Sequence, residues 1–66
     1  MSKLLDIQEL AELLGRSTET IRKDVRRRPD AVPPRLVIPG TRLLRWRASD
    51  VEAWLEAHVE RAAGAP

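Results

Sequence analysis

The pattern of apolar and polar positions predicts a short helix near the start of the chain. Between residues 7 and 14, apolar residues recur at intervals of three and four, which is the spacing of one helix face. They are Ile7, Leu10, Ala11, Leu13 and Leu14. Asp6 fits the N-cap, and Glu9 stands three residues later, where it completes a capping box. Gly15 suits the end of this helix, because glycine adopts the left-handed conformation at no steric cost.

A second, strongly basic helix follows at residues 18–28. Ile21 and Val25 are its aliphatic anchors, so the pattern predicts a narrow buried face and a wide exposed one. Ser17 is the predicted N-cap, and Pro29 cannot continue the helix. The small side chain of Ala11 lets the two helices cross closely. Two short helices joined by a glycine turn predict a helix-turn-helix.

The remaining pattern predicts a hairpin and a third helix. Residues 35–38 and 42–46 alternate in hydrophobicity on either side of Pro39–Gly40, which is the sequence of a type II turn. Ser49 and Glu52 form another candidate capping box. The apolar face of the third helix would contain Val51, Trp54, Leu55, His58 and Val59. The predicted core contains Leu10, Leu14, Ile21, Val25, Leu36, Leu44, Trp46, Val51, Trp54 and Leu55.

The predicted fold class is therefore mainly α: a small winged helix-turn-helix of three helices, with a two-stranded β-hairpin wing between helices 2 and 3. A chain of 66 residues has room for one small core. We expect one domain over residues 1–60 and a frayed tail over residues 61–66. No run is apolar enough to span a membrane, so we expect a soluble, cytoplasmic protein.

Charge is distributed unevenly along the chain, although the net charge is only +2. Residues 16–28 contain six basic and two acidic residues, and residues 35–47 contain four arginines and no acid. Residues 50–61 contain four acids and one arginine. Two basic segments beside an acidic third helix indicate that one side of the fold meets a polyanion.

The position of the basic helix favours binding to double-stranded DNA over a merely solvated surface. The second helix of a helix-turn-helix enters the major groove with its N-terminal residues at the base edges. Arg22 is the first candidate for base readout, because a guanidinium pairs bidentately with guanine, and Lys23 is the second. Glu19 either accepts from a cytosine amine or stabilises the helix dipole. The predicted contacts on this helix are Ser17, Thr18, Glu19, Thr20, Arg22, Lys23, Arg26 and Arg27.

The hairpin adds a second set of candidate contacts. Arg42, next to the hairpin tip, is the best candidate for the minor groove, and Arg35 and Arg45 are candidates for phosphate contacts. An ordinary exposed strand arginine would have the same sequence pattern. The wing would therefore contact the minor groove or the backbone while the second helix occupies the major groove.

Other polar and aromatic residues favour structural roles. Trp46 and Trp54 fall at inward positions, so we expect them in the core rather than stacked on bases. His58 has no neighbouring set of metal ligands, and the chain contains no Cys. The acidic residues of the third helix are most simply a solvated face. We expect no enzymatic activity, metal or cofactor, because no phosphate loop or catalytic constellation is present.

Two sequence blocks resemble the small excisionases and AlpA-type regulators of phages and other mobile elements. One is ELAELLG followed by Ser17 and Thr20, and the other is WRASDVEAWL at residues 46–55. The resemblance extends from residue 4 to about residue 58. Those relatives are winged helix-turn-helix proteins related to the DNA-binding domain of MerR. Asp24 departs from the family pattern, which often has an apolar residue there, and so does Pro39, where the hairpin is usually glycine-rich.

The resemblance implies an excisionase, or recombination directionality factor, that binds adjacent sites cooperatively, bends DNA and works with an integrase. The acidic third helix of one copy can face the basic wing of the next, which predicts head-to-tail self-association on DNA. Two alternatives stay open. One is an AlpA/MerR-like transcriptional regulator, and the other is a protein-interaction module that uses the acidic third helix or Leu43.

Overall fold

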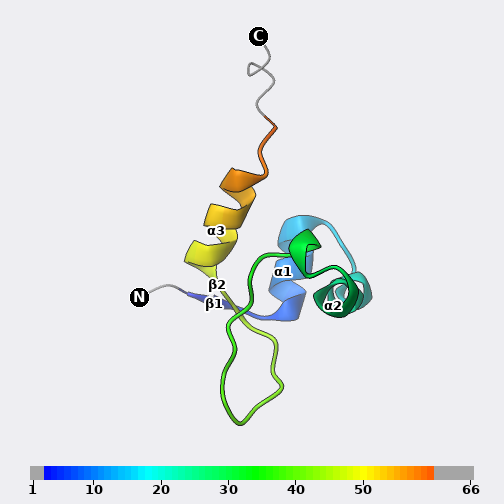
Figure 1. The fold of residues 1–66 in the computed structure, drawn as a ribbon, viewed down its shortest axis with the longest axis vertical. Coiled ribbons are helices and arrows are strands. Elements are labelled where there is room, and N and C mark those ends of the chain that lie inside the picture. Colours follow the sequence, from blue (N-terminus) through cyan, green and yellow to red (C-terminus); the bar gives the residue numbers. More distant parts are fainter. Residues whose placement is uncertain (1–2, 61–66) are drawn as a thin grey trace.

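Three helices and a small antiparallel sheet make up the fold of the computed structural model, which describes residues 3–60 (Figure 1). The predicted fold class, three helices with an antiparallel wing between helices 2 and 3, is confirmed. The tail at residues 61–66 lies outside the described residues. In chain order the elements are β1 (Leu4–Leu5), α1 (Ile7–Leu14), α2 (Thr18–Arg27), the 3-10 helix η1 (Pro29–Ala31), β2 (Trp46–Arg47) and α3 (Ala48–Ala57).

The ends of α1 and the start of α2 are set by local capping, as the sequence predicts. The Asp6 amide donates to Glu9 Oε1 at 3.0 Å, and the Glu9 amide donates to Asp6 Oδ1 at 2.7 Å, so the capping box is complete. Gly15 ends α1 with φ of 69°, in the left-handed region. Ser17 caps α2 by accepting from the Thr20 amide at 3.1 Å.

The core lies where α1, α2 and the segments flanking the wing meet. Its buried side chains are Leu10, Ala11, Ile21, Val32, Trp46 and Val51. Half-buried apolar side chains pack around them: Leu5, Ile7, Leu14, Val25, Leu44 and Leu55. Trp46 is fully buried, and its indole Nε1–H donates to the Pro33 carbonyl at 3.1 Å. That bond ties the connector after α2 to the strand that leads into α3.

The wing is a loop closed by a single antiparallel bridge rather than by a regular two-stranded ladder. Leu36 pairs with Arg45, and the Leu36 amide donates to the Arg45 carbonyl at 2.8 Å. At the tip, Gly40 has φ of 81°, and the Thr41 amide donates to the Ile38 carbonyl at 3.4 Å. These values fit the predicted type II turn with Pro39 and Gly40 at its centre.

The regular strand pairing instead joins the N-terminal segment to the segment that leads into α3. β1 pairs antiparallel with β2, with Leu4 opposite Arg47 and Leu5 opposite Trp46. The Ala48 amide then donates to the Lys3 carbonyl at 2.7 Å. The return arm of the wing therefore pairs with the outgoing arm at Arg45 and then pairs with β1. This pairing supports Trp46 from the side opposite the wing.

Two residues of the predicted core lie outside it. Leu36 is half-buried and does not belong to the buried cluster. The sequence pattern placed Leu36, Leu44 and Trp46 on the inward face, but the register pairs Leu36 with Arg45, which places Leu36 on the face opposite to Leu44 and Trp46. Trp54 is also half-buried outside the cluster. Its ring centroid lies 4.3 Å from that of exposed His58, whose Nδ1 lies 2.8 Å from the Trp54 carbonyl.

The start of α3 also differs from the prediction. The helix begins at Ala48 with Arg47 as its N-cap, so Ser49 lies inside the first turn rather than at the cap. Arg47 instead donates to Asp50 through Nε at 2.6 Å and Nη2 at 2.9 Å. This bidentate pair lowers the pKa of Asp50 and raises the pKa of Arg47, because each charge and its hydrogen bonds stabilise the other. Asp50 is therefore an ion-pair partner and not simply part of a solvated face.

The elements lie along one axis in a simple order (Figure 1). α3 extends to one end, the wing extends to the other, and α1 and α2 lie beside the middle. The acidic helix and the basic wing are thus at opposite ends of the described molecule. Among residues 3–60, no helix is long and apolar enough to cross a membrane.

Candidate nucleic-acid interface

A side chain in the turn before α2 links this helix to the 3-10 helix η1. Arg16, in the turn, bonds Asp24 Oδ2 at 3.3 Å and the Ala31 carbonyl at 2.9 Å through the same nitrogen. Asp24 is half-buried, with 18% of its side chain exposed. Its carboxylate gives Arg16 a partner, which explains an acid at a position where an apolar residue is common in the resembling family. The cations on α2 itself are exposed: Arg22, Lys23, Arg26 and Arg27.

The N-terminal turn of α2 presents hydroxyl groups that already bond one another. Ser17 Oγ accepts from the Thr20 amide and lies 2.9 Å from Thr20 Oγ1. Thr18 is half-buried, whereas Ser17, Glu19 and Thr20 are exposed. A phosphate placed here would meet a helix N-terminus whose cap is preorganised. The roles of these four residues toward DNA stay predictions.

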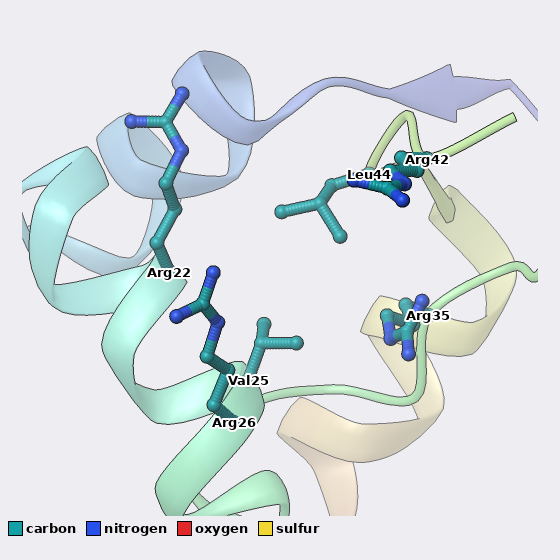
Figure 2. A pocket seen from close by; sticks show the side chains of 6 residues that line it. All are labelled: Arg22, Val25, Arg26, Arg35, Arg42 and Leu44. Carbon is teal, nitrogen blue, oxygen red and sulfur yellow. The ribbon is translucent and has the colours of Figure 1, made fainter.

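A groove lined by four arginines separates α2 from the wing (Figure 2). Arg22, Val25 and Arg26 lie on its α2 side, and Arg35, Arg42 and Leu44 lie on its wing side. Val25 and Leu44 point toward each other across the opening. The hollow has a volume of about 330 Å³, and among residues 3–60 no acidic side chain lines it. Its floor is apolar and its rim carries four fixed positive charges, as expected for a channel that receives a polyanionic chain.

The other predicted contact residues lie outside this lining. Lys23 and Arg27 are exposed on α2. Arg45 is half-buried, and its Nη1 donates to the Leu44 carbonyl at 2.8 Å, so its guanidinium bends back against the wing. The structure therefore brings together Arg22, Arg26, Arg35 and Arg42 from the predicted set and leaves Lys23, Arg27 and Arg45 at the periphery.

Sequence reasoning missed the apolar floor of the groove. Val25 and Leu44 were both expected in the core, where each is in fact half-buried, but each also lines the space between the arginines. Only the packing of the wing across α2 produces this double role. A local signal existed in the arginines near both residues, since Arg26 follows Val25 and Arg42 lies two positions before Leu44.

Potential metal ligands do not cluster in the part of the chain that the structure describes. Within residues 3–60, His and acidic side chains do not gather in groups of three or more that could hold a metal ion. The arrangement of the groove instead suits a ligand whose negative charges repeat along an extended backbone.

A family model described as a helix-turn-helix domain matches residues 4–59. The chain belongs to that family. The family consists of small DNA-binding domains that are generally not enzymes, so the match indicates DNA as a partner of the domain. A search of curated proteins and a search of solved structures each found no match to the chain.

Proposed function

We propose that this domain is an excisionase-type factor that binds adjacent sites on double-stranded DNA cooperatively and bends the duplex. The observation that carries the proposal is the groove between α2 and the wing, with its four arginines. In this arrangement α2 enters the major groove, one phosphate backbone lies in the arginine-lined groove, and the wing reaches the neighbouring minor groove.

The arginines divide into readers and clamps by their place on α2. Arg22 lies one turn before Arg26, nearer the N-terminal end that approaches base edges. Arg22 therefore reads a guanine, with Lys23 beside it, while Arg26 and Arg27 hold phosphates. Arg35 and Arg42 hold the same backbone from the wing side, because they line the groove opposite Arg26.

One such module needs help to discriminate its site from bulk DNA. A single domain of this size buries roughly 600 to 1,000 Å² of protein surface on DNA, which gives limited specificity. Neighbouring copies raise the apparent affinity without improving any single contact. The acidic α3 and the basic flank of the wing lie at opposite ends of the molecule, so one copy can meet the next head to tail. Such contacts do not close into a ring and build a short filament that bends the duplex.

This filament suits a factor that acts in the cytoplasm at the nucleoid and brings integrase sites together. A second candidate function, a protein-interaction module, is favoured by one observation on α3. Trp54 is half-buried outside the core cluster, so α3 offers an aromatic surface beside its acidic residues. On that reading the domain would keep its activity when the groove arginines are neutralised.

Selection from a random duplex library tests the proposal directly. We expect an enriched motif, followed by protection of adjacent copies in footprinting and anomalous gel mobility from a bent complex. The matched variant Arg22→Gln/Arg26→Gln should lose the enrichment. A single isolated complex without cooperativity or bend would instead identify a plain repressor or activator of the AlpA/MerR kind. A library that yields no motif would refute sequence-specific binding.

A further inference from the structure

The tip of the wing exposes two large aliphatic side chains beside the arginine-lined groove. Val37 on the outgoing arm is 71% exposed, and Leu43 on the return arm is 56% exposed. They stand on either side of the Pro39–Gly40 turn. Single exposed aliphatic residues are common on protein surfaces. Leu43 differs from such residues because it directly follows Arg42, one of the four groove arginines, on a projecting loop.

The tip is held in shape by backbone and side-chain hydrogen bonds. The turn bond between the Thr41 amide and the Ile38 carbonyl closes its end at 3.4 Å. The Leu43 amide donates to Thr41 Oγ1 at 3.1 Å, which fixes the return arm directly after the turn. The bridge between Leu36 and Arg45 closes the base. Leu43 thus lies on a hydrogen-bonded loop, so little conformational entropy of the backbone is lost when Leu43 makes a contact.

The order of elements across the groove determines what lies beneath the tip. Across a duplex, a major groove is followed by one phosphate backbone and then by the minor groove. If α2 occupies the major groove, Arg26 holds the near side of that backbone, and Arg35 and Arg42 hold its far side. The tip beyond Arg42 then faces the floor of the minor groove rather than a phosphate.

We propose that the wing tip is an apolar wedge that enters the minor groove and partly unstacks a base step, with Leu43 as the side chain that inserts. Leucine is among the side chains that act as minor-groove wedges, and such wedges kink duplexes by about 20° to 90° toward the major groove. Charge complementarity favours DNA as the occupant over a second copy of this chain, because Arg42 immediately precedes Leu43 and Arg35 lines the same groove. The wedge supplies the bend within each module, and flexible pyrimidine–purine steps should be preferred at that position although no base edge is hydrogen-bonded.

The inference rests on the proposed DNA binding, and its test uses a duplex first enriched with the wild-type protein. Leu43→Ser is compared with Leu13→Ser, which removes an equally exposed leucine, also 56% exposed, from α1. The duplex carries 2-aminopurine at successive steps under the wing, and the bend is measured by energy transfer between its ends. For Leu43→Ser we expect binding to persist, the bend to decrease by roughly 20° or more, and the unstacking signal to disappear. Leu13→Ser should retain both, and Leu43→Met should restore both.

Each outcome separates the wedge from the proposed function. If the wild-type protein enriches no motif, DNA recognition fails before the wedge is tested, and the wedge fails with it. If a motif is enriched and Leu43→Ser leaves the bend and the 2-aminopurine signal unchanged, the wedge is refuted while DNA recognition stands. A loss of cooperative binding at an unchanged bend would assign the tip to a protein contact and would also overturn the wedge.

Discussion

Replacement of Arg26 by glutamine tests whether the groove between α2 and the wing receives a phosphate backbone. Each phosphate neutralised by the protein contributes about 0.9 to the slope of log affinity against log salt concentration. If Arg26, Arg35 and Arg42 each neutralise one phosphate while Arg22 reads a base, the three contribute a slope of about −2.7, which corresponds to a loss of about 40-fold in affinity between 50 and 200 mM salt. Arg26→Gln should reduce that contribution to about −1.8, or about 12-fold.

Lys3→Gln provides the matched control, because it removes the same charge from an exposed residue that does not line the groove. Fluorescence anisotropy with a labelled duplex over a salt series measures both slopes. Arg26→Gln should flatten the slope on preferred and random duplexes alike, and Lys3→Gln should leave it close to the wild-type value. Equal flattening by both variants would mean that net charge alone drives binding. An unchanged slope for Arg26→Gln would show that the phosphate backbone does not lie in the groove.

Three further predictions follow from the buried core, α2 and the start of α3. Trp46→Ala should lower the free energy of unfolding by about 3 to 5 kcal/mol, because Trp46 is fully buried. Trp54→Ala, at a half-buried position outside the core cluster, should lower it by no more than about 2 kcal/mol. Urea titrations that rank the two variants in the opposite order would refute the assigned core. Arg22→Ala should lose about 1 to 3 kcal/mol of binding free energy on the selected duplex and relax preference at one base pair, and an equal loss on random duplexes would make it a phosphate contact. Since Arg47 lowers the pKa of Asp50, the pair stabilises the fold above about pH 4 and loses that contribution as the pH falls through the lowered pKa. Asp50→Asn should therefore make the stability, measured by thermal melts, depend less on pH in the acid range.

The parts of the fold that depend on near neighbours could be predicted from the sequence. The capping box of Asp6 and Glu9, the left-handed Gly15 and the Ser17 cap each involve residues within a few positions of one another. Their hydrogen bonds form inside one turn of chain, so residue type and spacing are sufficient to identify them. The type II turn around Gly40 is predictable for the same reason.

Features set by register or by distant packing could not be predicted. The position of Leu36 can be predicted only when its cross-strand partner is known, because a shift of one residue in register reverses the face on which Leu36 lies. Trp54 has the helical spacing of a core residue, yet its ring lies against His58. The cations of the candidate site were identified one by one. Their gathering into a groove depends on how the wing folds across α2, which no local pattern encodes.

The pairing of Leu4–Leu5 with Trp46–Arg47 has a consequence for how the chain folds during synthesis. The two paired segments are separated by roughly forty residues, a long loop to close. A chain leaving the ribosome can form α1 and α2 from local contacts, but Trp46, which fills the centre of the core, emerges only after the entire wing. At about 5 to 20 residues per second, Leu10 and Ile21 remain without their main partner for a time on the order of seconds. During that interval the helical pair is open to chaperones and proteases, and the arrival of the strand at residue 46 ends that exposure.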